Sequence, residues 1–575
     1  MAVTLTPKVA ALVERGTQLM RVGEFNEAAR VLERALQQMP QVAELHGMQA
    51  EALLRSERLE AALAAAQRAL RLRPGWGEAL MLRGNIQARL GRSAEAETSF
   101  REAMRTLGAA PALQANLANV LLEQGRFGEA LQAYDASLAG GADPLGLERG
   151  RARALLGVGR RADAEAAWKR VLEREPDSVE ALEQLMQIYT GERRLDELEA
   201  VCARGVALAA KPAIFHVFLG FSAWLRRRSE DALAHYREAA RIAEGSDAEM
   251  FHEANKNEAV ALFALGRLRE GWERYRWRLD REALRGRYPL LAAAPAALAA
   301  APALRVRIHQ EQGIGDELFF LRFAAPLRAA GHRLSYRGER KLVELLAGRT
   351  ELFESIGLEG EPEASACDVE LQSSDLALAS GHDFAPPLPL VPQAARSQAA
   401  LARLHAFGPP PYVGVTWSAG AVAEERANRG DAAVWLKRVP IAELAAALRP
   451  LRAGIIVLQR RPEAADMAAF TAALGRAALD ASDINDDLRD AVAMLASLDD
   501  YVGMSNTNMH LLAGLPGPRA RVLTQSPAEW RWGMDGRESA WFPGFRLYRQ
   551  TPDRSWNEAF RQLQDDLEKA YASAT

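Results

Sequence analysis

Alanine recurs through the first half of the chain at a fixed spacing of 34 residues, with a leucine in one of the seven places. The seven residues are Ala28, Ala62, Ala96, Ala130, Ala164, Leu198 and Ala232. Seven residues after each of them stand Ala35, Ala69, Ala103, Ser137, Val171, Gly205 and Ala239. Pro40, Pro74 and Pro176 follow twelve residues after a member of the first set. Small side chains let two antiparallel helices approach closely, and a proline ends the second helix of a pair. The pattern predicts seven helix pairs and an eighth, looser pair, together spanning residues 1–280.

The second half of the chain follows a different pattern. After an alanine-, leucine- and proline-rich linker at 281–303, short apolar runs alternate with helical patterns. The predicted strands are LRVRIH, RLSYRG, YVGVTW, GIIVLQR, YVGMSN and RVLTQ. Such alternation is typical of a mostly parallel sheet. Prolines between 384 and 411 mark a seam, so we expect two α/β lobes, 304–410 and 411–575, with a cleft between them.

Composition narrows the class of protein. The 575 residues are 49% hydrophobic and 26% charged, which is typical of a globular chain with more than one domain. A net charge of −3 gives no global basic field that would recruit nucleic acid or an anionic membrane. Cys202 and Cys367 have no metal-ligand spacing. Because no leader or long apolar span is visible, we expect a soluble cytoplasmic protein without membrane insertion.

The stretch HQEQGIGDELFFLRF carries the first candidate chemistry. Gly313 and Gly315 are expected to permit a tight turn after a strand, with Gln312 in the same loop. Asp316 has two possible roles at the start of the following helix. It would accept backbone hydrogen bonds as an N-cap, or remove a proton from an acceptor hydroxyl as a general base. The glycine spacing lacks the full GxGxxG pattern, so it does not support a dinucleotide site.

Several motifs occur together in a fixed order. The segment VGEFNEAARVLERALQQMP resembles a tetratricopeptide repeat (TPR). EQGIGDELFFLRFAAPLRAAG, VGVTWSAG, WLKRVPIAEL, YVGMSNTNMHLLAGL and EWRWGMDGRESAWFPGFRLYRQ follow. Together they resemble bacterial TPR glycosyltransferases related to ADP-heptose:lipopolysaccharide heptosyltransferases. The resemblance implies an α plus α/β architecture, in which a TPR solenoid precedes a GT-B domain of two Rossmann-like lobes. It places the acceptor mainly on the first lobe and the nucleotide sugar mainly on the second.

The resemblance also implies roles for particular residues. Asp316 matches the acid that follows the glycines and is the candidate general base. Lys437 and Arg438, in LKRVP, match a basic pair whose lysine is placed for the donor phosphates, where an ammonium stabilises a leaving group without a metal. The alternative for Lys437 is an exposed lysine at a helix entry.

Further donor contacts are expected from the second lobe. Asn506, Thr507 and Asn508 open a helix and are a candidate phosphate cradle. Asn506 stands where relatives carry an aspartate. His510 either contacts a phosphate or packs in the core. The remaining candidates are Thr416, Trp417 and Ser418 at a strand end, and Gln459 for the base or ribose.

The last segment is predicted to be mainly structural. The aromatic run from Trp530 to Tyr548 is interpreted as core packing, and only Arg531 in it as a ligand contact. The final helix is expected to cross back to the first lobe.

These observations favour a glycosyltransferase that moves a sugar from a nucleotide-sugar donor to a protein hydroxyl. The TPR groove would recruit the acceptor protein, and the architecture suggests flagellin. No metal and no cofactor is expected, because DxD, HExxH and P-loop motifs are absent. Two alternatives stay open: a glycolipid or lipopolysaccharide acceptor, and a non-catalytic TPR adaptor with a degenerate glycosyltransferase domain, which Asn506 favours.

Overall fold

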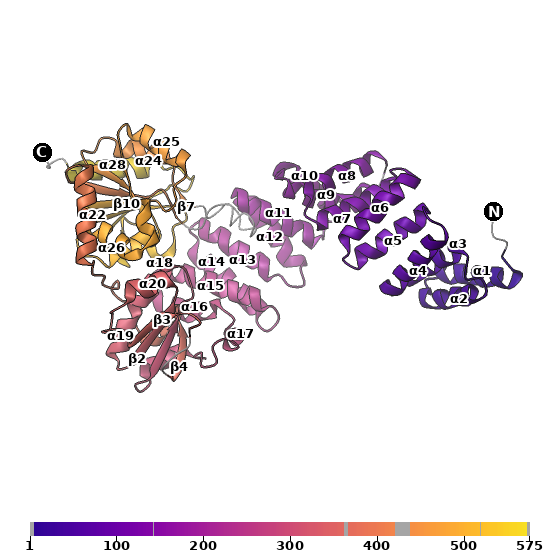
Figure 1. Ribbon diagram of the computed structural model, residues 1–575, viewed down its shortest axis with the longest axis horizontal. Helices are drawn as coiled ribbons and strands as arrows, with labels where there is room; N and C mark the ends of the chain where they lie inside the picture. The colour runs from indigo at the N-terminus through magenta and orange to yellow at the C-terminus, as the bar shows by residue number, and fades with distance from the viewer. Residues whose placement is uncertain (1–4, 142, 362–365, 420–436, 518, 572–575) are drawn as a thin grey trace. The chain divides into compact units, whose positions relative to one another are not determined.

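The chain forms two compact units, Met1–Leu208 and Ala209–Thr575 (Figure 1). The computed structural model describes residues 5–141, 143–361, 366–419, 437–517 and 519–571. In this described part, no helix is both long enough and apolar enough to cross a membrane.

The first unit is a stack of helices. Its helices are α1 (Pro7–Arg21), α2 (Phe25–Gln38), α3 (Ala43–Arg55), α4 (Leu59–Leu72), α5 (Gly77–Arg89), α6 (Ser93–Leu107), α7 (Pro111–Glu123), α8 (Phe127–Ala139), α9 (Pro144–Gly157), α10 (Arg161–Arg174), α11 (Val179–Glu192) and α12 (Leu195–Leu208). Each helix packs on the next one in the chain.

The repeat predicted from the small residues is confirmed. The second helices of the pairs begin at Phe25, Leu59, Ser93, Phe127, Arg161 and Leu195, 34 residues apart. The six residues of the first set that lie in this unit, Ala28, Ala62, Ala96, Ala130, Ala164 and Leu198, are completely buried. Gly84 shows why small residues are needed, because a Cβ there would lie 2.6 Å from the Phe100 ring. The sequence spacing therefore reflects close packing between paired helices.

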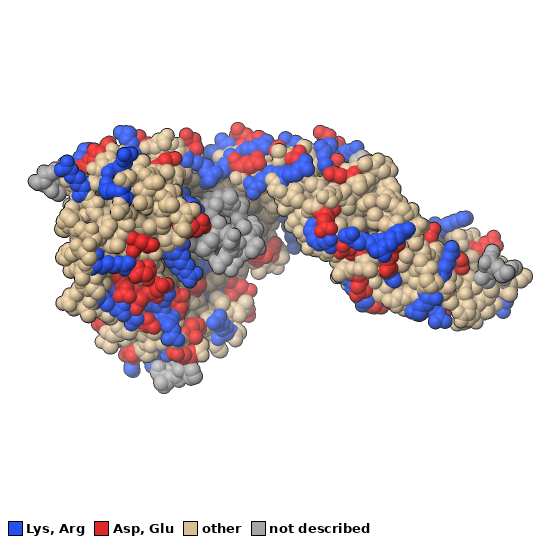
Figure 2. Space-filling view, turned by 45° about the horizontal axis from the view of Figure 1, so that its top comes forward, with Lys and Arg blue, Asp and Glu red and all other residues tan. Residues whose placement is uncertain are grey.

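Charged side chains connect neighbouring repeats on the surface. Figure 2 shows basic and acidic side chains interspersed along the helices of the first unit. Arg126 pairs with Glu97 at 2.7 Å, and Arg194 pairs with Glu165 at 2.6 Å. The surface in this view has no large region of one charge, in line with the small net charge of the sequence.

The second unit begins with two more helix pairs and continues into two sheets. Its helices before the first sheet are α13 (Ala213–Leu225), α14 (Ser229–Ala243), α15 (Ala248–Ala264), α16 (Leu268–Tyr275) and α17 (Arg281–Arg285), with 3-10 turns η1 (Arg276–Arg278) and η2 (Pro295–Ala300). The division between the two units thus lies within the helix pairs and before the predicted linker.

The first sheet contains four parallel strands in the order β3-β2-β1-β4. The strands are β1 (Arg305–His309), β2 (Arg333–Gly338), β3 (Ser355–Leu358) and β4 (Val369–Gln372). Between and after them lie α18 (Ile314–Phe320), η3 (Leu321–Phe323), α19 (Ala324–Ala329), α20 (Arg340–Leu346), η4 (Ser373–Asp375) and α21 (Leu376–Ser380).

The second sheet contains seven strands in the order β12-β13-β11-β10-β5-β8-β9, parallel except for β12. They are β5 (Tyr412–Val415), β8 (Gly454–Val457), β9 (Leu479–Asp480), β10 (Asp500–Met504), β11 (Arg519–Thr524), β12 (Glu538–Ser539) and β13 (Phe542–Arg549). A separate ribbon pairs β6 (Ser418–Ala419) with β7 (Lys437–Arg438). The helical elements are α22 (Ala394–Phe407), α24 (Ile441–Leu448), α25 (Ala464–Leu474), η6 (Ser482–Asp486), α26 (Leu488–Ala496), α27 (Thr507–Ala513), η7 (Trp530–Trp532) and α28 (Asn557–Tyr571).

Packing in the second unit corrects one prediction about the last helix. The apolar side of α28, with Phe560, Leu563 and Leu567, packs with α24 and strand residues of the second sheet. The expected crossing to the first lobe is therefore wrong. The aromatic run from Trp530 to Tyr548 is buried, as predicted, because its indole and phenyl rings fill the core.

The last helix pairs share their core with the sheets. Trp272, on α16, is 1% exposed and contacts the rings of Phe320, Phe323 and Trp541. Its indole N–H donates to the Asp383 carbonyl at 3.2 Å. The helix pairs α13 to α16 and the α/β region are therefore one packed unit.

Candidate functional site

The loop after β1 is held in place by a buried carboxylate. Glu317, on α18, accepts hydrogen bonds at Oε1 from the backbone N–H groups of Glu311 and Gln312 at 2.9 and 3.0 Å, and from Ser373 Oγ at 2.5 Å. Its Oε2 accepts from the Tyr336 hydroxyl at 3.3 Å. Burial raises the pKa of Glu317 to about 7, although these hydrogen bonds from Ser373 and the two N–H groups favour the ionised form. Glu317 thus fixes the backbone that precedes the predicted catalytic aspartate.

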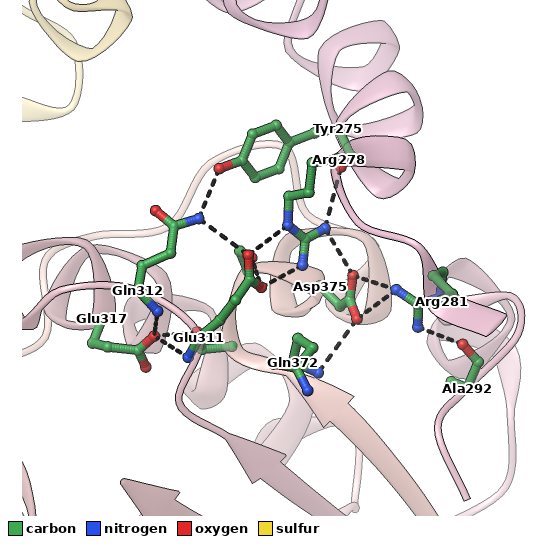
Figure 3. Close-up of polar contacts among 11 residues, drawn as sticks. Tyr275, Arg278, Arg281, Ala292, Glu311, Gln312, Glu317, Gln372 and Asp375 are labelled. Carbon is green, nitrogen blue, oxygen red and sulfur yellow. Dashed lines mark hydrogen bonds and ion pairs between the residues drawn. The ribbon is translucent and has the colours of Figure 1, made fainter. Parts of the chain in front are cut away.

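A buried ion-pair network adjoins the same loop (Figure 3). Arg278 donates from Nε to Glu311 at 2.8 Å and from Nη1 to Asp375 at 3.1 Å. Arg281 contacts both oxygens of Asp375 at 2.9 Å. The Gln312 amide donates to the Tyr275 hydroxyl at 2.9 Å, alongside the network. Because these groups come from the end of the helix pairs, from the loop after β1 and from η4 after β4, the network joins the last helix pair to the carboxyl edge of the first sheet.

The glycine loop itself differs from the prediction. Gly313 is the N-cap residue of α18, with φ −67° and ψ 160°, a conformation open to any residue. Asp316 lies within the first turn of this helix, so the N-cap role, one of the two possible roles of this residue, does not apply. Neither Gly313 nor Gly315 has a positive φ, so the expected tight turn does not need a glycine at either position for its backbone conformation. A Cβ at Gly313 would meet nothing within 4 Å, so this loop residue faces open space.

Gly315 is needed for a close approach between two helices. A Cβ at this position would lie 3.0 Å from His510 Cδ2 and 3.6 Å from Thr507 Cα. The helix that begins at the glycine loop therefore packs directly on α27. Two motifs that are almost 200 residues apart in the sequence meet at this contact.

The start of α27 is organised by Asn506. Its Oδ1 accepts from the Met509 N–H at 3.3 Å, and its Nδ2 donates to Thr416 Oγ1 at 2.9 Å and to the Tyr501 hydroxyl at 3.1 Å. Thr416 and Tyr501 also share a hydrogen bond of 2.8 Å. Asn506 therefore caps the helix through its side-chain oxygen and donates to two hydroxyl groups through its amide nitrogen, a donation that a carboxylate could not make.

Gln459 fixes the turn between β5 and β6. Its Oε1 accepts from the backbone N–H groups of Trp417 and Ser418, both at 3.0 Å. The Trp417 ring is buried and stacks on Phe470 at a centroid distance of 5.2 Å. Of these three predicted donor contacts, Ser418 is half-buried, while the side chains of Gln459 and Trp417 are engaged within the protein.

The two predicted catalytic residues are connected by a chain of alternating charges. Asp316 Oδ1 lies 2.5 Å from Arg531 Nη2, and Lys437 Nζ lies 2.8 Å from Glu529 Oε1. Arg531 Nη1 and Glu529 Oε2 are 3.7 Å apart. The Ser505 hydroxyl donates to Glu529 at 3.3 Å. Asp316 lies on α18, which follows β1 of the first sheet, and Lys437 belongs to the β6–β7 ribbon. This charge relay, defined as Asp316, Arg531, Glu529 and Lys437, therefore connects the loop region after β1 with the ribbon that follows β5.

A small hollow lies beside the charge relay at the carboxyl ends of β10 and β11. Its lining residues are Lys437, Met504, Ser505, Leu523, Thr524, Gln525, Glu529 and Trp532. Three buried polar atoms here, Thr524 Oγ1, Gln525 Nε2 and Trp532 Nε1, have no hydrogen-bond partner among the described residues. Two of these atoms are donors only. Because buried polar atoms are normally satisfied, these two donors suit a group with acceptor oxygens, but the hollow of about 10 Å³ admits a group larger than one water only if a lining side chain moves.

His510 lies in a strongly basic environment. Burial, and then the positive charges of Arg531, Arg322 and Lys437, hold the pKa of His510 well below its usual range, so its ring is neutral near pH 7. Its Nδ1 is buried without a hydrogen-bond partner within the described ranges. Arg322 is 3% exposed, and it lies over the Phe319 ring and donates to two backbone carbonyls.

The other predicted site residues are less centrally placed. Arg438 pairs with Asp466 on α25 at 2.6 Å, away from the charge relay. Asn508 is buried, and Thr507 is half-buried at the first position of α27. The structure thus brings Asp316, Gly315, Thr507, His510 and Lys437 into one connected region.

Sequence reasoning did not identify Glu317 or Glu529. Glu317 directly follows the predicted base in GDELFF, but its apolar surroundings gave it the appearance of an ordinary helix residue. Glu529 precedes the aromatic segment WRW, and no local pattern connects it with a lysine 92 residues earlier. Arg531, which the sequence indicates as a ligand contact, contacts Asp316 within the chain.

Comparison with known proteins supports the assignment of helix-pair repeats to the N-terminal region. Residues 13–76, 81–145 and 149–212 match the family described as tetratricopeptide repeat. Protein FlbA of Caulobacter vibrioides is 28% identical over 327 residues, covering 50% of this chain and 50% of that protein. The chain therefore spans about half the length of this curated relative.

Solved structures of TPR proteins are similar to this chain at low identity. A tetratricopeptide repeat protein of Parabacteroides merdae is 15% identical, with a TM-score of 0.34, over 43% of this chain and 99% of that one. A thermophilic TPR protein of Thermus thermophilus is 21% identical, with a TM-score of 0.26, over 30% of this chain and 94% of that one. From the family match and the 34-residue helix pairs, we conclude that the N-terminal region of this chain is a tetratricopeptide-repeat solenoid.

Proposed function

We propose that this chain is a glycosyltransferase that transfers a sugar from a nucleotide-sugar donor to a hydroxyl group of an acceptor protein. The observation that carries the proposal is the charge relay. Asp316 and Lys437, which are 121 residues apart in sequence, are separated by only two side chains, Arg531 and Glu529. A carboxylate and an ammonium placed this way can serve the two ends of one displacement reaction.

The proposed reaction assigns one role to each end of the charge relay. The oxygen of the acceptor hydroxyl forms a bond to the anomeric carbon of the donor sugar, and its proton passes to the Asp316 carboxylate. The bond between the anomeric carbon and the phosphate oxygen breaks, and the electron pair leaves with the nucleotide. Lys437 stabilises the negative charge that develops on this oxygen. Gly313 leaves open space beside the loop for the acceptor.

The repeats support a protein as the acceptor. TPR solenoids generally bind other proteins, because stacked helix pairs present an extended groove. The network of Arg278, Glu311 and Asp375 joins the last helix pair to the loop that precedes Asp316. An acceptor segment held by the final repeats would therefore reach the proposed base without a flexible connection. Flagellin is one acceptor protein of this kind.

A non-catalytic TPR adaptor is the second candidate. It is favoured by the internal pairing of both reactive groups, since Arg531 holds Asp316 and Glu529 holds Lys437. An adaptor would need no nucleotide-sugar site, so donor binding separates the two candidates.

The first test is a thermal-shift panel with UDP-, GDP-, ADP-, dTDP- and CMP-linked sugars. We expect one nucleotide class to stabilise the wild type but not Lys437→Ala. Lys569→Ala, which removes an exposed lysine from α28, is the matched control and should respond like the wild type. With that donor, Asp316→Asn should still bind but should no longer transfer sugar to an acceptor protein. A folded wild-type protein that no donor stabilises would refute the enzyme proposal and favour the adaptor.

A further inference from the structure

The two cations of the charge relay are both paired with carboxylates of the same chain. Lys437 contacts Glu529, and Arg531 contacts Asp316 and lies near Glu529. The Lys437 side chain is 26% exposed and that of Asp316 is 36% exposed, so solvent reaches both ends. The Glu529 and Arg531 side chains between them are 19% and 8% exposed. A ligand can therefore reach these ion pairs from the solvent and take the place of one carboxylate in each pair.

The hollow beside Glu529 shows which chemical group would replace it. Among the described residues that line the hollow, Glu529 is the only carboxylate, and Lys437, Gln525 and Trp532 are residues with side-chain donors. The Gln525 and Trp532 donors lack partners among the described residues. A phosphate group offers several acceptor oxygens and negative charge, so it satisfies donors that a single carboxylate leaves unused.

We propose that Glu529 and Asp316 occupy the place of the donor diphosphate in the resting protein. On binding, the diphosphate takes the position of Glu529 on Lys437 and that of Asp316 on Arg531, with Gln525 and Trp532 as further contacts. This inference rests on the proposed glycosyl transfer and adds Arg531, Gln525 and Trp532 to the donor site.

The exchange has a consequence for the base. In the resting protein Asp316 Oδ1 accepts a hydrogen bond from Arg531 at 2.5 Å, so one of the two carboxylate oxygens is engaged. When the diphosphate takes over Arg531, both oxygens become available to the acceptor hydroxyl. Donor binding therefore releases the base from its internal partner.

Anion binding measures the proposed competition directly. Isothermal titration calorimetry with inorganic pyrophosphate, UDP, GDP and ADP is applied to the full chain and to variants whose thermal melts match the wild type. Because each carboxylate competes with the anion, Glu529→Gln and Asp316→Asn should each tighten pyrophosphate binding by about tenfold, which corresponds to ~1.4 kcal/mol. Arg531→Gln should weaken it and cancel the gain of Asp316→Asn.

The matched control removes a carboxylate from a neighbouring ion pair outside the charge relay. Asp466 pairs with Arg438, the residue that follows Lys437 in the sequence. Asp466→Asn should leave the affinity for pyrophosphate unchanged. An equal gain in Asp466→Asn would mean that any lost negative charge has the same effect, and would overturn the exchange. Unchanged or weaker binding in both Glu529→Gln and Asp316→Asn would overturn it as well. If one of these variants does not fold, the other decides.

Carboxyl labelling tests the release of the base. Carbodiimide with glycine ethyl ester should label Asp316 faster in the presence of saturating pyrophosphate than in its absence. Unchanged labelling would overturn the release. A wild type that binds nucleoside diphosphates without the predicted variant effects would leave the glycosyltransferase proposal standing and refute only the exchange. A wild type that binds no diphosphate would refute both.

Discussion

Replacing Arg278 by methionine should loosen the loop that leads to Asp316. The Arg278 side chain is 3% exposed and carries the ion pair with Glu311, whose own side chain is 9% exposed. Asp375 keeps a cation in the variant, because Arg281 contacts both of its oxygens. Among the residues that the structure describes, Glu311 keeps only neutral hydrogen-bond partners, the Ser374 hydroxyl and the Gln312 amide. Breaking one side of a buried ion pair costs about 3–5 kcal/mol, so we expect a local loss of that order in Arg278→Met.

The loss should depend on pH in a defined direction. Burial acts to raise the pKa of Glu311, but the Arg278 charge and hydrogen bonds outweigh it, so the pKa lies below its usual value. In the wild type this carboxylate contributes stability above its unfolded pKa and loses it as the pH falls. Without Arg278, burial dominates, the folded-state pKa rises, and the variant gains stability as the pH falls. The difference between the two proteins should therefore shrink between pH 7 and pH 5.

Hydrogen exchange of segment 305–323, measured by mass spectrometry, gives the opening free energy of this region without requiring the whole chain to unfold as one unit. The double variant Arg278→Met/Glu311→Gln is the matched control, because it removes both charges and should recover most of the lost protection. Protection equal to the wild type in Arg278→Met, or no recovery in the double variant, would refute the role given to this ion pair.

Two further predictions concern the glycine helix. Gly315→Val should destabilise the contact between α18 and α27 by about 1–3 kcal/mol, because even a Cβ would lie 3.0 Å from His510 Cδ2. Gly313→Ser should be tolerated, because a Cβ there meets nothing within 4 Å. Thermal melts compare the two variants, and equal melting temperatures would contradict the packing argument. Glu317, with a pKa of about 7 against an ordinary value of 4.5, binds more protons in the folded state, so the stability of its loop should fall by up to about 3 kcal/mol as the pH rises through this window. In Glu317→Gln, hydrogen exchange should show a smaller change of loop stability with pH. An unchanged pH dependence would show that another group causes it.

The parts of the fold that follow from local pattern were predictable. The small residue at Ala28 and its equivalents recur because each helix pair meets the same neighbour, and the packing repeats with the sequence. Six apolar runs, such as LRVRIH and YVGMSN, contain strands of the parallel sheets. In contrast, β3 and β9 were not predicted. β9 is two residues long, too short for a clear period, and β3, although as long as β5 and β8, is only half-buried and gives a weaker apolar signal. Both become strands because β2 and β8 offer them an edge.

The candidate site was predictable only in part. Asp316 and Lys437 were identified from motifs, because they stand beside glycine and proline signals. Their connection through Arg531 and Glu529 depends on contacts between segments up to 215 residues apart, which no local spacing encodes. Gly315 was correctly singled out but for another reason, since the glycine serves a helix contact and not a turn.

The division of the chain at residues 208 and 209 has a consequence for how such a protein can change over evolutionary time. Each repeat of a solenoid depends mainly on its neighbours, so the first unit can gain or lose a 34-residue pair at little cost to the rest. The pairs α13 to α16 have no such freedom, because Trp272 is part of the core around α18 and Trp541. The segment that has to be inherited as a whole therefore begins near Ala209, with two helix pairs fixed to the α/β region.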